Sequence, residues 1–227
     1  MIRTMLRRLR RDDAGISLTE LLVASTLTVL VMAMIGTMFV QVTRITRDSN
    51  DTQVFNGLAS NAANELSAVL RVATVHPIAN VATPEPAIVS GTRSVLTIYS
   101  LSNTSPTNPA PVKVTFTLDS TGKITEDRCG GVASGGYWTF TTCSTTSSRS
   151  FGKGILLPTG VSDQLFTYLD VNGDPILIGT GSLSAAQRAQ VAAILITIRV
   201  QTVGSPTGAV LVSNKVVLRN LGLDTGL

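Results

Sequence analysis

The stretch LLVASTLTVLVMAMIGTMFV, residues 21–40, contains no charged side chain in a chain of 227 residues. As an α-helix, residues 16–40 would measure roughly 37 Å, which exceeds the hydrocarbon thickness of a bilayer, about 30 Å. The run is longer than the apolar core of an ordinary signal peptide, and no small-x-small cleavage site follows it. It therefore predicts a membrane-spanning helix over residues 16–40, to which the rest of the chain is attached.

Positive charge is concentrated ahead of this helix. Residues 1–15 contain five arginines and two aspartates, so the remaining residues carry only +1 of the formal net charge of +4. Because arginine and lysine favour the cytoplasmic side, a single pass with the N-terminus inside is predicted, in the cytoplasmic membrane and with the head outside. The near-neutral remainder offers no clustered basic face, so no nucleic acid is expected as a partner.

The composition argues against most enzyme chemistry. Only 14% of the residues are charged, and His76 is the single histidine. Zinc sites and Ser-His-Asp relays need histidines in number or in partnership. We therefore predict no catalytic residue, no metal site and no cofactor, and expect a protein that is not an enzyme.

One carboxylate, Glu20, lies at the start of the apolar run, where it costs several kcal/mol unless it is paired or protonated. The segment GISLTELLVA, residues 15–24, resembles the processing and methylation motif of the type IV pilin and type II secretion pseudopilin superfamily. The resemblance implies that a prepilin peptidase removes a leader, residues 1–15, by cutting between Gly15 and Ile16, and that the new amine of Ile16 is N-methylated. It also implies that Glu20 guides assembly by pairing with that amine on a neighbouring subunit. The chain departs from the family pattern at Ile16, where Phe or Met is commoner, and at Thr37, where many major pilins have Pro.

The spacing of this motif has an independent physical rationale. An α-amino group has an ordinary pKa of about 7.7 to 8.0, so the new terminus would be mostly cationic at the edge of hydrocarbon. Glu20 lies four residues from Ile16, about one helical turn, and can meet an amine on its own chain or on a neighbour's. Either pairing lowers the cost of placing both charges there.

Residues 41–76 are predicted to continue the helix in amphipathic form. Apolar residues recur at three- and four-residue steps between Phe55 and Ala73, which predicts one stripe facing a core. The helix is expected to end at His76 and Pro77, with the imidazole capping its end.

Residues 77–227 are predicted to form a β-rich globular head. After a proline-containing loop over residues 77–93, strands are expected at residues 94–101, 112–118, 124–128, 137–143, 164–171, 194–200 and 209–218. A turn is expected at residues 119–122, at Asn172-Gly173 and at residues 204–208, and a short helix at residues 183–190. The fold class is therefore α+β, a pilin-like long N-terminal helix packed on a single, mostly antiparallel sheet. More loosely, residues 166–173, 183–188 and 217–220 resemble J-type minor pseudopilins and W-type minor pilins.

Cys129 and Cys143 are the only cysteines, and both fall in the part predicted to be exported. An even count in an oxidising compartment favours a disulfide, which would close a glycine-rich segment. A zinc or redox role is not expected, because the chain has no CxxC pair.

Two further patterns can be interpreted either as turns or as ligand-binding loops. Asp170, Asn172 and Asp174 are spaced like the first ligands of a calcium loop, but the pattern lacks a closing acid, and a hairpin turn explains the same residues. Gly152-Lys153-Gly154 is too short for a phosphate loop, and a turn between strands is expected.

These observations predict a minor pilin or pseudopilin. Its expected partners are a prepilin peptidase, other pilins or pseudopilins in a filament, an inner-membrane assembly platform and, before assembly, membrane lipid. The alternative is a single-pass, membrane-anchored extracytoplasmic binding module. A competence pilus for DNA uptake would use the same architecture, and the near-neutral head gives it no direct support.

Overall fold

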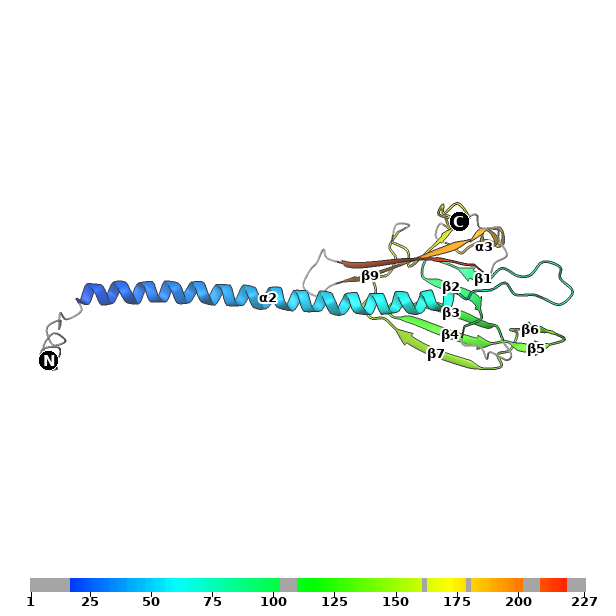
Figure 1. Cartoon of the computed structure of the whole chain (residues 1–227), viewed down its shortest axis with the longest axis horizontal. Coiled ribbons are helices and arrows are strands. Elements are labelled where there is room, and N and C mark those ends of the chain that lie inside the picture. Colours follow the sequence, from blue (N-terminus) through cyan, green and yellow to red (C-terminus); the bar gives the residue numbers. More distant parts are fainter. Residues whose placement is uncertain (1–16, 103–109, 161–162, 179–180, 202–208, 220–227) are drawn as a thin grey trace, which may run out of the picture. The chain divides into compact units, whose positions relative to one another are not determined.

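The computed structural model describes residues 17–102, 110–160, 163–178, 181–201 and 209–219 (Figure 1). Its contacts divide the chain into two compact units, residues 1–49 and 50–227. Helix α2, Leu18–Leu70, contributes residues to both units. The predicted leader, Gly15, Ile16 and the predicted turn at residues 204–208 lie outside the described residues.

In the first unit, α2 is helical without interruption from Leu18 onward. Its hydroxyl side chains bond back to the helix, as in Thr26 donating to the Leu22 carbonyl at 2.8 Å and Thr28 donating to the Ala24 carbonyl at 2.7 Å. Gly36 does not break the helix, and the neighbouring Thr37 hydroxyl also bonds inward, to the Met34 carbonyl at 2.8 Å. Both backbone and hydroxyl groups are satisfied inside the helix, which is a requirement for a segment in hydrocarbon. This part of α2 is long and apolar enough to cross a membrane.

In the second unit, the end of α2 supplies one side of a hydrophobic core. The buried residues are Ala59, Ala62, Ala63, Leu66, Ser67, Val69 and Leu70. The first three of these residues are alanines that present only a methyl group, which lets the sheets approach the helix backbone closely. The predicted amphipathic stripe is confirmed.

The end of the helix differs from the prediction. The helix stops at Leu70, and the expected capping role of His76 is wrong. After a turn at residues 71 and 72, the chain pairs with the end of strand β2, Val95–Ser100, as in Thr74 donating its amide to the Tyr99 carbonyl at 3.0 Å. Val72, Thr74 and Val75 are β-branched, and pairing with a strand satisfies their backbone groups better than another helical turn would.

A five-stranded antiparallel sheet lies on one side of the helix, in the order β1-β2-β3-β4-β7. Its strands are β1 Ile88–Gly91, β2 Val95–Ser100, β3 Val112–Leu118, β4 Ile124–Gly130 and β7 Thr146–Phe151. In β3 the buried positions Val114, Phe116 and Leu118 alternate with more exposed ones, as the sequence predicted.

A second antiparallel sheet has the order β10-β9-β8, formed by β8 Phe166–Leu169, β9 Ala193–Gln201 and β10 Ala209–Val217. Figure 1 shows β9 and β3, β4 and β7 on opposite sides of the last turns of α2. Contacts agree, since Asn214 of β10 donates to the Ser67 hydroxyl at 2.8 Å while Arg149 of β7 reaches Glu65 at 2.8 Å. The α+β class is confirmed, but the expected single sheet is wrong. The helix is covered by two sheets that share one core.

Two smaller elements complete the head. Helix α3, Ala185–Gln190, begins with a capping box in which the Ser184 hydroxyl accepts from the Gln187 amide and the Gln187 side chain accepts from the Ser184 amide. The hairpin of β5 Val132–Ser134 and β6 Tyr137–Thr139 projects beyond β4. The predicted short helix is confirmed, whereas the predicted strand at residues 137–143 is regular only as far as Thr139.

Candidate assembly site and head cavities

Glu20 lies in the first turn of α2 and is exposed. No described residue forms a hydrogen bond or an ion pair with its carboxylate. The first turn of a helix has unpaired amides and a partial positive charge, which favours an acid there but leaves the carboxylate available to a further cation. Gly15 and Ile16, the predicted cleavage and methylation residues, lie outside the described residues.

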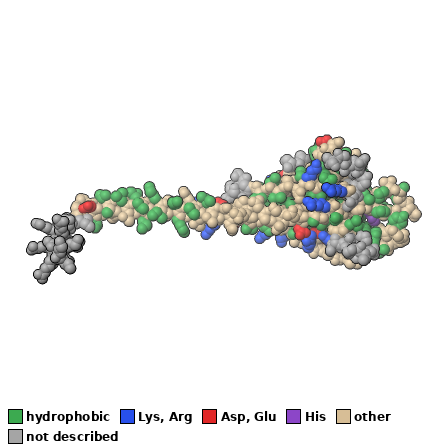
Figure 2. Space-filling model, in the orientation of Figure 1, with side chains coloured by type: hydrophobic (Ala, Val, Ile, Leu, Met, Phe, Trp, Pro, Cys, Tyr) green, Lys and Arg blue, Asp and Glu red, His purple; other side chains and the backbone are tan. Residues whose placement is uncertain are grey.

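The helix beyond Glu20 exposes large apolar side chains around its circumference. Leu21, Val29, Met34 and Phe39 are each more than 60% exposed. Figure 2 shows hydrophobic side chains spread along its visible face. An apolar surface of this extent is stable only against lipid or against other protein.

An arginine on the five-stranded sheet links α2 to a buried carboxylate in that sheet. Glu126 of β4 is 0% exposed and accepts from the Arg128 side chain and from Arg149 of β7, whose Nη2 lies 2.6 Å from Glu126 Oε2. The same Arg149 atom lies 2.8 Å from Glu65 Oε2 on the helix. Burial favours neutral arginine, but the hydrogen bonds to Glu65 and Glu126 outweigh it and raise the pKa of Arg149. The guanidinium is therefore charged at any accessible pH and ties the helix to the five-stranded sheet.

Cys129 and Cys143 form the predicted disulfide, with their Cα atoms 5.0 Å apart. Cys129 is in β4, and Cys143 follows β6, so the bridge closes the loop that carries the β5–β6 hairpin. Gly131 allows this loop to pack tightly, because a Cβ there would lie 3.3 Å from both the Phe140 and the Trp138 ring. Trp138 and Phe140 therefore lie on the same side of the loop, against Gly131.

A cavity of about 420 Å³ lies between this loop and the start of the head. It is lined by His76, Ile78, Ala79, Glu85, Tyr99, Lys113, Ser134, Tyr137, Trp138, Thr139, Phe140 and Thr141. Burial lowers the pKa of His76, and Glu85 opposes that change only in part. Burial, followed by the hydrogen bond to Glu85, raises the pKa of Tyr99, so its hydroxyl stays protonated and donates to Glu85 Oε2 at 2.8 Å. The sequence analysis did not predict this cavity. The alternating aromatic residues Trp138 and Phe140, in a loop closed by a disulfide, were a signal that could have indicated it.

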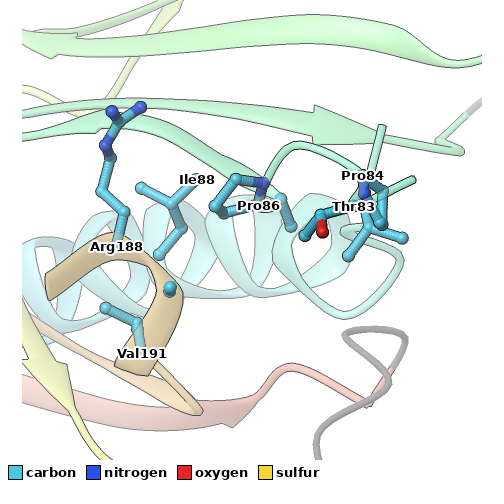
Figure 3. A pocket seen from close by; sticks show the side chains of 9 residues that line it. Thr83, Pro84, Pro86, Ile88, Arg188 and Val191 are labelled. Carbon is cyan, nitrogen blue, oxygen red and sulfur yellow. The ribbon is translucent and has the colours of Figure 1, made fainter. Parts of the chain in front are cut away.

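A second cavity, of about 340 Å³, lies beside α3 and is shown in Figure 3. Its lining is mostly apolar, with Pro84, Pro86, Ile88 and Val191 among the contributors. Arg188 stands at its edge, and its Nη1 donates to the Val89 carbonyl at 2.5 Å. The guanidinium therefore serves the backbone of β1, and the cavity resembles an apolar recess more than a polar binding site.

The calcium-like residues form a turn. Asp170 Oδ1 accepts from the amides of Asn172 and Asp174, each at 2.9 Å, and Gly173 takes a positive φ of 85°. In the described part of the chain, no group of three or more His, Cys, Asp or Glu side chains could hold a metal ion. The predicted turn at Asn172-Gly173 is confirmed, with an isolated antiparallel bridge between Leu169 and Pro175 across it.

Gly152-Lys153-Gly154 likewise forms a turn that leads out of β7, with both glycines at positive φ.

Among protein-family models and among curated proteins, this chain finds no match.

Proposed function

We propose that this protein is a minor pilin or pseudopilin, a structural subunit that enters a type IV pilus or a type II secretion-like filament after prepilin peptidase cleavage. The observation that carries the proposal is the first part of α2. It combines an exposed, membrane-length apolar surface with one carboxylate, Glu20, in its first turn, which has no partner among the described residues. A plain membrane anchor needs the apolar surface but has no use for the acid.

The proposed mechanism follows from the cost of that acid. A carboxylate at the edge of hydrocarbon costs several kcal/mol unless it is neutralised or paired. Cleavage after Gly15 would create an amine four residues before Glu20 and would remove the five arginines that hold the terminus in the cytoplasm. A neighbouring subunit's Glu20 would pair with this amine, and the apolar surface of α2 would exchange lipid for the helices of the filament.

The head suits such a role because it is built onto the same helix. The last turns of α2 belong to the same compact unit as the head. The Glu65–Arg149–Glu126 connection and the shared core fix the head to these turns. Force or displacement applied to that part of the helix is therefore transmitted to the head. The head would make the lateral or tip contacts, with the prepilin peptidase and the inner-membrane assembly platform acting on the N-terminal segment.

Glu20→Gln tests the proposal, because it keeps the size of the side chain and removes its charge. We expect normal membrane insertion and normal cleavage, but a loss of the protein from the sheared or detergent-resistant filament fraction. Thr19→Val is the matched control, since it removes a polar group from the same turn without changing charge. Incorporation of Glu20→Gln at the wild-type level would refute the pairing and leave the membrane-anchored binding module as the better account.

A further inference from the structure

The head contains an aromatic cavity whose chemistry the assembly role does not use. Three rings meet in its wall, with centroid distances of 4.5 Å between His76 and Tyr99, 5.0 Å between Tyr99 and Phe140, and 5.2 Å between His76 and Phe140. Trp138 and the 38% exposed Tyr137 extend this wall from the β5–β6 hairpin. Aromatic faces arranged around a recess provide large, flat apolar contact areas.

Polar groups converge on the same space. Glu85 Oε2 accepts from the Tyr99 hydroxyl, and the Lys113 ammonium lies 5.8 Å from the centroid of the Phe140 ring. His76 is only 6% exposed, yet its Nδ1 is buried without a hydrogen-bond partner. Buried polar atoms are rarely left unpaired, and this one belongs to a side chain that lines the cavity.

The balance of charge restricts the class of ligand. Lys113 and Glu85 are of opposite charge, and His76 is neutral at pH 7 because burial lowers its pKa. The lining therefore carries no net charge. An anion or a cation gains little from such a wall, and the Lys113 ammonium near the Phe140 ring would repel a ligand cation there. A neutral ligand with apolar faces and with both donors and acceptors on its rim fits better.

The walls of the cavity are held in place before any ligand arrives. The Cys129–Cys143 disulfide closes the loop that carries Trp138 and Phe140, and Gly131 seats both rings against the backbone. Little ordering of the loop would accompany binding, which favours affinity. The cavity in Figure 3 differs, because its lining is mostly apolar and its one charged group, Arg188, donates to the backbone of β1.

We propose that the cavity between the disulfide-closed loop and the His76–Tyr99 pair binds a neutral saccharide unit. A sugar ring would place its C–H face on Phe140 and Trp138. Its hydroxyl groups would donate to Glu85 and accept from Lys113. A volume of about 420 Å³ accommodates one or two sugar rings. The inference goes beyond filament assembly and does not depend on it, because the cavity belongs to the head alone.

The protein contains its own reporter, since Trp138 is its single tryptophan and lies in the cavity wall. The full chain, reconstituted in lipid nanodiscs that contain no glycolipid, is titrated with glucose, galactose, N-acetylglucosamine and its trimer while tryptophan emission is recorded. Glycerol at matched concentration controls for a solvent effect. We expect a saturable change in emission with at least one of the sugars and none with glycerol.

Two variants locate the binding. Phe140→Leu removes a ring from the cavity, and its matched control Phe151→Leu removes a ring on β7 that packs on Phe116 instead, with centroids 6.5 Å apart. We expect at least a tenfold weaker affinity for Phe140→Leu and unchanged affinity for Phe151→Leu. Tyr137→Ser changes an exposed lining residue, so the fold is retained, and a several-fold loss is expected there.

Three results would overturn the proposal. The first is no saturable change with any of the sugars up to tens of millimolar, about ten times a weak Kd near 1 mM. The second is sugar binding that Phe140→Leu and Tyr137→Ser leave unchanged. The third is saturable binding of choline in place of sugar, which would make the cavity a site for cations. None of these three results would change the interpretation of the Glu20 experiment. A negative result for Glu20→Gln would likewise leave the saccharide proposal unchanged.

Discussion

Arg149 contacts both an exposed and a buried carboxylate. We predict that loss of the buried interaction lowers the free energy of unfolding more than loss of the exposed one. Glu126 is fully buried and has two arginine partners, whereas Glu65 is on the surface, with side chains 49% exposed for Glu65 and 48% for Arg149. Three single variants, Glu65→Ala, Arg149→Ala and Glu126→Ala, each remove a different part of the network.

The magnitudes follow from exposure. Glu65→Ala removes a solvent-screened pair and should cost about 0.2–1 kcal/mol. Arg149→Ala takes one of two cationic partners from a buried carboxylate, and we expect about 1.5–3 kcal/mol, the usual value of a hydrogen bond to a charged group. Glu126→Ala leaves Arg128 and Arg149 without the buried acid and leaves a cavity beside the sheet. It should therefore lower the free energy of unfolding the most, by about 3–5 kcal/mol.

The measurement is urea unfolding of the full chain in nanodiscs, followed by near-ultraviolet circular dichroism. A double-mutant cycle on Glu65 and Arg149 gives their coupling directly, and the slope with urea should be the same in every variant. The expected order of stability is wild type, then Glu65→Ala, then Arg149→Ala, then Glu126→Ala. A Glu65→Ala loss as large as that of Glu126→Ala would refute the assignment of the buried carboxylate as the main anchor.

Three other predictions concern the head. Replacing both cysteines of the Cys129–Cys143 bridge by Ser should lower the free energy of unfolding by about 3 kcal/mol in the chain-entropy model, because the bridge closes a loop with a sequence separation of 14, and reductant should produce the same shift of the urea midpoint in the wild type alone. Gly91→Ala should cost about 1–3 kcal/mol, because its Cβ would lie 2.5 Å from the buried Tyr168 hydroxyl. Gly57→Ala should instead stabilise the protein by up to about 1 kcal/mol, because its Cβ would meet nothing within 4 Å on an exposed helix face. Melting temperatures that ranked the two variants the other way would be inconsistent with this packing. Burial lowers the pKa of His76 below its ordinary 6.5, so the folded state binds this proton less readily than the unfolded state. Stability should be full above about pH 6.5 and fall as the pH drops below that value, and a His76→Gln variant with the same slope there would contradict this cause.

The membrane helix and the main strands could be predicted from sequence because each has a strong local period. Residues 21–40 contain no charged side chain, and strand residues such as Val114, Phe116 and Leu118 alternate with polar ones. Turn chemistry was equally local, since Asn172-Gly173 needs the positive φ that glycine supplies at 85°. The disulfide followed from the count of two cysteines.

What could not be predicted depends on contacts between distant segments. Strand β7 reads TSSRSF and is exposed along most of its length, so it lacks an alternating pattern, and only its pairing with β4 makes it a strand. The helix end at Leu70 is decided by pairing of residues 72–75 with β2, not by His76 or Pro77. The aromatic cavity needs His76, Tyr99 and Phe140 to meet across 64 positions of sequence, which no local pattern encodes.

The central claim is that this chain becomes a filament subunit by removal of its arginine-rich leader. The most direct test is the intact mass of the protein, purified from cells with and without a prepilin peptidase. We expect a chain that begins at Ile16 and carries one added methyl group when the peptidase is present, and an unmodified chain that retains residues 1–15 when it is absent. A chain that retains Met1 in both strains would contradict the claim and would make the protein a permanently anchored binding module.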